Sequence, residues 1–595
     1  MSRRNEANEK PGSRSIRYGA GRPMKERPVR SVRSAALITM ICGALLQACA
    51  SSGPSSVGLQ SVPQPSLGDY LSARFAGSMR DTTVAADYYL KAVQRDPDNP
   101  RLLQRAFALT VQDARFDQAV VLAHRLASLS SSATIAQLIL VLDDIARADY
   151  EAARTKLDGA PTAGINALFG PVMRAWALVG DNRIDEALDA LAPLSEEQSF
   201  HAFMAYHRAM ILEVAGRNQE AEASYNKALS GRQRSIRVVL AYGRLLERSG
   251  RAEDSLFLYQ EHLDRFPVNP LLLHAVDRAT RGEKPGHMVS DPAEGVAEAL
   301  FGTAHALISE SARPAATVYL RLATFLRPDM PDAYLLLGSV LQGIGQLENA
   351  LREYGRIPDH SPLAWGVKLE MASIISRLDR PEEAITLLSN MVGERANDLQ
   401  AITALADVLR DQERYEEAGV QYDRAIATLA EVNKNHWPLF YSRGIALERT
   451  KQWERAEADF LKALELELDQ PLVLNYLGYS WIEMGRNVER ARAMIERAVE
   501  LRPNDGYIVD SLGWAMFRLG DYESAVDTLE RAILLQPDDP TINDHLGDAY
   551  WKVGRLREAR FQWRHALALG PAADLVPGIE AKLEGGAVTA ENERP

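Results

Sequence analysis

The stretch Asp505–Pro537, DGYIVDSLGWAMFRLGDYESAVDTLERAILLQP, decides the fold. Leu512 and Gly513 lie in the first of two predicted helices, where a residue without a side chain lets the second helix pack closely. Gly520 supplies the turn between the helices. Ala525 begins an apolar stripe that continues four and seven residues later, and the proline that closes the stretch ends the second helix. The stretch therefore predicts a helical hairpin, and one hairpin alone cannot bury both of its apolar faces.

The same hairpin recurs along the chain. Its small second-helix residue returns in steps of 34 between residues 85 and 255 and again between 316 and 418, and then after steps of 38, 35, 34 and 34. Such a period is typical of stacked helical repeats. The pattern resembles the tetratricopeptide repeat, which implies an all-α, right-handed superhelical solenoid of about 14 repeats. The repeated positions are Ala85, Ala119, Ala153, Ala187, Ala221, Ser255, Ala316, Ala350, Ala384, Ala418, Ala456, Ala491, Ala525 and Ala559.

Two interruptions divide the array. Between Ser255 and Ala316 the step is 61, and the added residues contain a predicted helix at Asn269–Arg281 followed by a new helix start at Asp291. The smaller insertion is Glu431–Trp437. The predicted organisation follows in chain order: six repeats plus the extra helix at 69–281, a linker at 282–295, eight repeats at 296–571, and a capping segment with a disordered tail at 572–595.

The N-terminal region has the pattern of a bacterial export signal. Basic residues precede an apolar run, Ala35–Leu46, which is shorter than the roughly 20 residues that a membrane-spanning helix needs. The sequence Leu-Gln-Ala-Cys that ends at Cys49 resembles the lipobox, which implies a signal peptide at 1–48 and lipidation of Cys49 as the mature N-terminus. An ordinary cleaved signal that contains a cysteine is the alternative. Because the lead-in is long, we expect translation to begin at Met24.

Residues 49–68 connect this cysteine to the repeats. They are rich in Ser, Pro and Gly and lack a helical stripe, so we expect a flexible tether with an end-to-end distance on the order of 25 Å. Ala50, where no Asp follows the cysteine, is similar to lipoproteins that are sorted onward to the outer membrane. This resemblance implies an outer-membrane lipoprotein that faces the periplasm and is held by its acyl chains without spanning the bilayer.

Composition and charge limit the classes of partner. The 595 residues are 46% hydrophobic and 25% charged, an ordinary globular mix. Removal of residues 1–48 takes away ten Lys or Arg and three Glu, so the net charge changes from −12 to −19. Nucleic acid is then excluded as an expected partner, because phosphate binding needs clustered positive charge. The two cysteines, Cys42 and Cys49, both lie in the export region, so no disulfide is expected in the body.

The sequence contains no motif that predicts catalysis. A Walker loop, a zinc-type histidine pair with an intervening glutamate and a Gly-x-Ser-x-Gly elbow are all absent from the sequence. The eleven histidines are scattered, and His201 and His207, six residues apart, do not share a helix face. We therefore expect a protein that is not an enzyme and that has no metal site and no cofactor. An enzyme with an unrecognised site is the alternative.

The candidate binding residues lie on the first helices of the last repeats. In the repeat family, ligands usually meet fixed positions of the first helix, and in this chain those positions carry large aromatic residues together with cations. Exposed aromatics beside Arg are typical of protein-binding hot spots. Packing against neighbouring helices is the alternative role of these aromatics. The predicted binding residues are Asn475, Tyr479, Asp510, Trp514, Phe517, Arg518, His545, Trp551 and Lys552.

The combined features resemble a narrower family. The lipobox, the tether, the long array, the stretch DPAEGVAEAL at 291–300 and the first helices at 474–480 and 510–514 are similar to proteobacterial outer-membrane lipoproteins. This family includes the binding partner of a periplasmic carboxyl-terminal processing protease. The resemblance implies an adaptor that recruits and activates such a protease toward its substrates. A scaffold for envelope assembly, serving pili, polysaccharide export or outer-membrane protein biogenesis, is the alternative.

Overall fold

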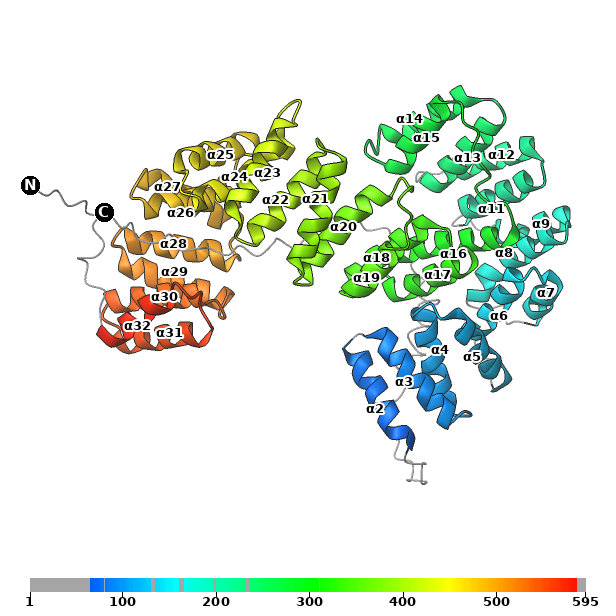
Figure 1. Ribbon diagram of the computed structural model, residues 1–595, viewed down its shortest axis with the longest axis horizontal. Helices are drawn as coiled ribbons and strands as arrows, with labels where there is room; N and C mark the ends of the chain where they lie inside the picture. The colour runs from blue at the N-terminus through cyan, green and yellow to red at the C-terminus, as the bar shows by residue number, and fades with distance from the viewer. Residues whose placement is uncertain are drawn as a thin grey trace, which may run out of the picture. The chain divides into compact units, whose positions relative to one another are not determined.

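A computed structural model of the protein describes residues 65–79, 81–129, 134–159, 165–195, 200–230, 235–309 and 311–585. Over these residues the chain is helical and contains no strand (Figure 1). It divides into two compact units between Asp379 and Arg380, called here the N-terminal unit and the C-terminal unit. The predicted signal peptide, Cys49 and most of the predicted tether lie outside the described residues.

The N-terminal unit is a series of helical hairpins with two additional helices between them, the short α10 and α15, and it ends in α20. Its helices are α2 (Pro65–Ser78), α3 (Thr82–Arg95), α4 (Pro100–Gln112), α5 (Phe116–Leu129), α6 (Thr134–Ala146), α7 (Tyr150–Asp158), α8 (Ile165–Gly180), α9 (Ile184–Ala190), α10 (Ala192–Ser195), α11 (His201–Val214), α12 (Asn218–Leu229), α13 (Ile236–Arg248), α14 (Ala252–Leu263), α15 (Pro270–Thr280), α16 (Pro292–Ser309), α17 (Arg313–Leu326), α18 (Pro331–Gly343), α19 (Leu347–Tyr354) and α20 (Ala364–Arg377).

The C-terminal unit continues the hairpins and ends in a single helix, α32. Its helices are α21 (Pro381–Glu394), α22 (Leu399–Asp411), α23 (Tyr415–Ala427), the 3-10 turn η1 (Lys434–His436), α24 (Trp437–Arg449), α25 (Trp453–Leu466), α26 (Pro471–Glu483), α27 (Val488–Leu501), α28 (Gly506–Arg518), α29 (Tyr522–Leu535), α30 (Pro540–Lys552), α31 (Leu556–Ala568) and α32 (Val576–Gly585).

The structure confirms the predicted solenoid of tetratricopeptide-type hairpins. Each of the fourteen small residues that set the period, from Ala85 to Ala559, lies on the second helix of a hairpin and is 0% exposed. A larger side chain at any of these positions would separate the two helices of its hairpin. The 34-residue period is therefore the spacing of the helix contacts themselves.

Close approach of the two helices also depends on the glycine of the first helix. A Cβ atom on Gly513 would lie 2.6 Å from Cγ of Leu529, and one on Gly547 would lie 2.5 Å from Cδ1 of Trp563. Gly520, in the turn after α28, has a φ of +85°, a conformation that favours glycine. These residues fix the hairpin geometry that the sequence predicted.

The connection at residues 282–291 joins α15 to α16 inside the N-terminal unit. Asp291 caps α16, because its carboxylate accepts a hydrogen bond of 2.9 Å from the backbone N–H of Glu294. At the start of the unit, α2 begins at Pro65, so the last residues of the predicted tether are helical.

Helices α16 and α17 return to pack against the first helices of earlier repeats, including α4, α6, α8 and α11 (Figure 1). Trp176 on α8 is fully buried and touches α16 so closely that a Cβ on Gly295 would lie 2.2 Å from its ring. Phe169 on α8 stacks on Tyr319 of α17 with ring centroids 5.3 Å apart. The first helices of these repeats are therefore covered by the chain itself.

Buried charges join α16 to α11 and α13. Glu298 on α16 is 2% exposed and accepts hydrogen bonds from Nε of Arg237 at 2.8 Å and from the hydroxyl of Tyr206 at 3.1 Å. A second guanidinium nitrogen of Arg237 donates to Asp332 at 2.9 Å. Burial alone would raise the pKa of Glu298, but the charge and hydrogen bonds of Arg237 outweigh it and lower that pKa. The buried charge of Glu298 therefore depends on the guanidinium of Arg237 for its stabilisation.

Candidate protein-binding face of the C-terminal unit

Three consecutive first helices, α26, α28 and α30, carry the predicted binding residues. Each helix starts at a side-chain cap that fixes its register. Asp505 accepts hydrogen bonds from the backbone N–H groups of Tyr507 and Ile508, and Asp539 does the same at the start of α30. Gln470 caps α26 through the N–H of Leu472. Equivalent positions of successive helices therefore fall side by side, and we call this surface the first-helix face.

A stacked aromatic cluster occupies the centre of this face. The indole ring of Trp514 lies between Phe517, at 4.8 Å between ring centroids, and His545, at 4.0 Å. Nδ1 of His545 lies 2.9 Å from Oδ1 of Asp510. All four side chains are less than 10% exposed. Because α28 and α30 each contribute to the cluster, it fixes the position of one repeat against the next.

Glu483 connects this cluster to α26. Its carboxylate accepts a hydrogen bond of 2.7 Å from Nε1 of Trp514 and one of 2.9 Å from Arg518. Glu483 was not among the predicted binding residues, although it occupies the same position of its first helix as Arg518 does one repeat later. A carboxylate there satisfies the indole N–H that the buried Trp514 would otherwise leave unpaired.

The burial of the predicted residues corrects one expectation. Large aromatics were expected to line an exposed surface, but Tyr479, Trp514 and Phe517 are 3–7% exposed. Asn475 and His545 are also buried, at 0% and 1%. Packing against neighbouring helices, the alternative reading, therefore describes Trp514. Those aromatics are the rings with which adjacent helices contact each other, so a solenoid buries them.

The accessible part of the face is its rim. Arg518 and Lys552 are exposed at the ends of α28 and α30, and Trp551 is half-buried beside Trp563, at 5.4 Å between ring centroids. Glu483 and Tyr507 are also half-buried. A partner at this rim would therefore meet Lys552, the guanidinium of Arg518 with its ion-pair partner Glu483, and half-buried aromatic side chains. Whether these side chains bind a protein stays a prediction.

The last helix closes the end of this face. Lys582 on α32 is 3% exposed, and its ammonium group donates hydrogen bonds to both oxygens of Asp544, at 2.8 and 2.9 Å, and to Asp548 at 2.7 Å. Asp548 also accepts a hydrogen bond of 3.0 Å from the indole of Trp563. Lys582 was not among the predicted residues, because the tail carries no repeat pattern that would align it with α30.

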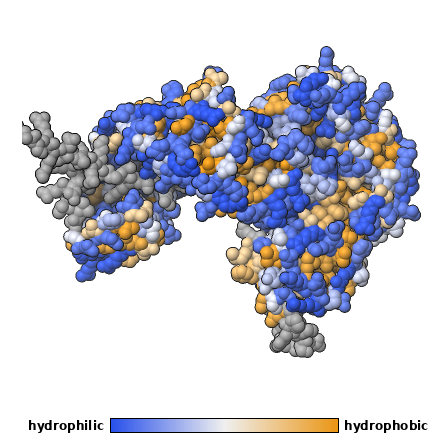
Figure 2. All heavy atoms as spheres, viewed as in Figure 1, coloured by the Kyte–Doolittle hydropathy of each residue, from blue (hydrophilic) through white to orange (hydrophobic). Residues whose placement is uncertain are grey.

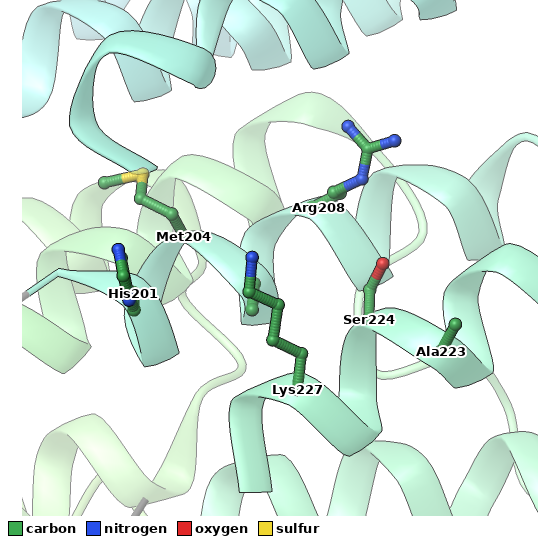
Figure 3. Close-up of a pocket in the computed structure, with 7 residues that line it drawn as sticks. His201, Met204, Arg208, Ala223, Ser224 and Lys227 are labelled. Carbon is green, nitrogen blue, oxygen red and sulfur yellow. The ribbon is translucent and has the colours of Figure 1, made fainter. Parts of the chain in front are cut away.

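A separate pocket lies in the N-terminal unit between α11 and α12 (Figure 3). In this view Lys227 rises between His201 and Arg208. No acidic side chain is among the residues that line it, and its serine, Ser224, donates its hydroxyl to the backbone carbonyl of Glu220. The pocket thus lacks a carboxylate that could act with His201 as an acid–base pair.

Among the described residues, no group of three or more His, Cys, Asp or Glu side chains could hold a metal ion. No helix among them combines the length and the apolar character needed to cross a membrane.

Three segments of the chain match known protein families, and each segment falls within the observed hairpins. Residues 513–554 match a family described as TPR repeat, and residues 172–235 and 441–506 match one described as tetratricopeptide repeat. The protein is thus a helical-repeat solenoid, a class that offers extended surfaces to other proteins. The matched segments are tetratricopeptide repeats.

Two relatives share part of this array. A TPR repeat-containing protein of Pseudomonas aeruginosa is 25% identical over 195 residues, which is 32% of each chain. The human protein O-mannosyl-transferase TMTC1 is 24% identical over 176 residues, 30% of this chain and 20% of that one. The chain thus spans a third or less of the length of either relative.

Solved structures with similar helices include the Cut9–Hcn1 hetero-tetramer of the APC/C, with 15% identity, a TM-score of 0.37, and coverage of 88% of this chain and 96% of that one. Yeast Tom70 has 12% identity, a TM-score of 0.29, and coverage of 87% and 95%.

Proposed function

We propose that this protein is an envelope adaptor that is anchored through a lipid on Cys49 and binds a protein partner at the first-helix face of its C-terminal unit. The observation that carries the proposal is the contrast between the two units. In the N-terminal unit, α16 and α17 cover the first helices of earlier repeats. In the C-terminal unit, α26, α28 and α30 keep exposed cations at a rim above a rigid cluster.

The chemistry of the rim favours a protein ligand. Arg518 and Lys552 supply positive charge on a chain whose net charge is −12, and Trp551 and Tyr507 add aromatic surface. Arg and aromatic side chains that are held rigidly lose little conformational entropy on binding. An acidic or extended segment of a partner protein suits such a rim. Tetratricopeptide repeats are protein-binding scaffolds, which supports the same conclusion.

The partner that we propose is a periplasmic carboxyl-terminal processing protease. Support for it comes from the resemblance of the lipobox, tether and array to outer-membrane lipoproteins that bind such a protease. The adaptor would hold the protease at the periplasmic side of the outer membrane and bring substrates to it. The chemistry of cleavage would then belong to the protease, and this chain would contribute binding and position.

Reconstitution with a cognate processing protease and a disordered substrate tests the proposal. The wild-type adaptor should raise the cleavage rate, and the double variant Arg518→Ala/Lys552→Ala should lose most of this effect. These exposed residues are better test positions than the buried Trp514, whose removal would also disturb the fold.

The matched control is Arg557→Ala/Arg564→Ala, which removes two exposed cations from α31 and should leave activation unchanged. Equal activation by both double variants would refute the rim as the binding site. Co-purification from solubilised envelopes separates the alternatives. Recovery of a pilus, polysaccharide-export or outer-membrane assembly complex without a protease would replace the adaptor with an assembly scaffold.

A further inference from the structure

Helix α2 carries an apolar stripe that nothing in the described part of the chain covers. Leu67, Leu71 and Phe75 recur every four residues along the helix and are 59%, 54% and 68% exposed, and Met79, directly after the helix, is 67% exposed. Side chains at this spacing share one helix face. In Figure 2, orange and tan atoms lie over α2 at that end of the N-terminal unit.

The opposite face of α2 accounts for its folding. Ala73 and Ala76 are buried against α3, and the ring of Tyr70 packs edge-on against Tyr89 at 6.1 Å between centroids. The helix therefore does not need the stripe to hold its place in the first hairpin. At the other end of the array, α32 covers the last repeat and buries Lys582 there. The last repeat is thus covered by a capping helix, whereas the first repeat exposes an apolar helix face.

We infer that the stripe on α2 docks on the lipid bilayer in which Cys49 is anchored. This inference rests on the proposed lipidation of Cys49. Pro65 follows that cysteine by only sixteen residues, so the connecting chain spans at most about 55 Å. An anchor at this range holds the helix at a high effective concentration near the membrane. Leu and Phe side chains that project from a helix held at a membrane surface bury apolar area at the lipid interface.

Charge at this end of the molecule is compatible with an anionic bilayer. Residues 65–112 carry six Lys or Arg and five Asp, whereas the whole chain has a net charge of −12. The excess of acidic residues therefore lies elsewhere in the sequence, and negatively charged headgroups would not repel α2. Isolated exposed hydrophobic residues such as Phe257, which is 76% exposed on α14, lack this regular spacing.

The test uses the lipidated full-length protein in vesicles of phosphatidylethanolamine and phosphatidylglycerol. A fluorophore is attached to a cysteine introduced as Leu71→Cys, and the control carries it at Phe257→Cys. Lipids with brominated acyl chains quench only probes that enter the bilayer. The probe at position 71 should lose most of its fluorescence while the probe at 257 keeps it. A Leu67→Cys variant repeats the measurement if the first variant is unstable.

Three results would overturn the inference. Equal fluorescence of the two probes, with acylated Cys49 found by mass spectrometry, leaves the anchor in place and removes the docking. Unmodified Cys49 removes the proposed anchor and this inference with it. A dimer seen by sedimentation, lost in Leu71→Ser/Phe75→Ser and accompanied by an unquenched probe at position 71, assigns the stripe to a second copy of the chain.

Discussion

Replacing Glu298 by Ala should destabilise the N-terminal unit severely. The carboxylate of Glu298 is buried and holds the guanidinium of Arg237, which is itself mostly buried, with 14% of its side chain exposed. Loss of one partner from a buried ion pair costs about 3–5 kcal/mol, because the other charge is left without compensation. Asp332 still accepts one hydrogen bond from Arg237, so we expect a loss at the lower end, about 3 kcal/mol.

Two further variants separate charge from packing. Glu298→Gln keeps the volume and one acceptor but removes the charge, and should cost less than Glu298→Ala. The double variant Arg237→Met/Glu298→Leu replaces the whole pair by apolar side chains, and its stability should be close to that of the wild type. If the double variant is as unstable as Glu298→Ala, the lost stability comes from packing and the electrostatic explanation is wrong.

Urea unfolding monitored by tryptophan fluorescence measures these differences. Trp176 lies between α8 and α16 and is fully buried, so its emission should report the separation of α16 from the earlier repeats. A Trp176→Phe background identifies its share of the signal. A loss below about 1 kcal/mol for Glu298→Ala would refute the reasoning, since an exposed ion pair contributes no more than that.

Three other perturbations follow from single contacts. Burial lowers the pKa of His207 to about 4, so the stability that its neutral form contributes is complete above pH 6.5 and is lost as the pH falls from 6.5 towards 4. Between pH 7 and pH 4.5, the unfolding free energy of His207→Phe should therefore fall by about 2.5 kcal/mol less than that of the wild type; equal falls would contradict this. Lys582→Met leaves Asp544 and Asp548 without their buried cation and should cost about 3–5 kcal/mol, seen as faster hydrogen exchange in α30; unchanged exchange would show that α32 does not hold the face. Gly513→Ala should cost about 1–3 kcal/mol in thermal unfolding because its Cβ meets Leu529, whereas Gly419→Ala, with open space around it, should not destabilise; equal effects would refute the close-approach explanation.

The hairpins could be predicted from the sequence because the residues that bring the two helices of a hairpin together lie within a single repeat. Ala525 and Gly513 are small where two helices cross, and this relation is local and recurs at a fixed period. The return of α16 onto α8 has no such period. It depends on the rotation accumulated over many repeats, which one repeat does not encode, and Gly295 opposite Trp176 is one local trace of it.

The sequence predicted which helices carry the candidate face, but it did not predict that the central side chains of the face are buried. The family pattern placed Trp514 and His545 on successive first helices, and the structure brings their rings to 4.0 Å. The position of a residue in a repeat does not show whether its ring faces a partner or packs on the next helix. Neighbouring positions on one turn of the first helix contribute to both the accessible surface and the contact between repeats. The capping contact of Lys582 lay beyond prediction for a different reason, since the tail has no repeat to align.

The contact of α16 and α17 with α4, α6 and α8 constrains how this protein can change in length. Repeat arrays ordinarily gain and lose hairpins by duplication and deletion, because each hairpin touches only its neighbours. Removing one hairpin between α8 and α16 would carry Gly295 away from Trp176 and Glu298 away from Arg237. The return contacts of α16 and α17 therefore fix the number of repeats between α8 and α16, whereas the hairpins from α22 to α31 pack in series on their neighbours.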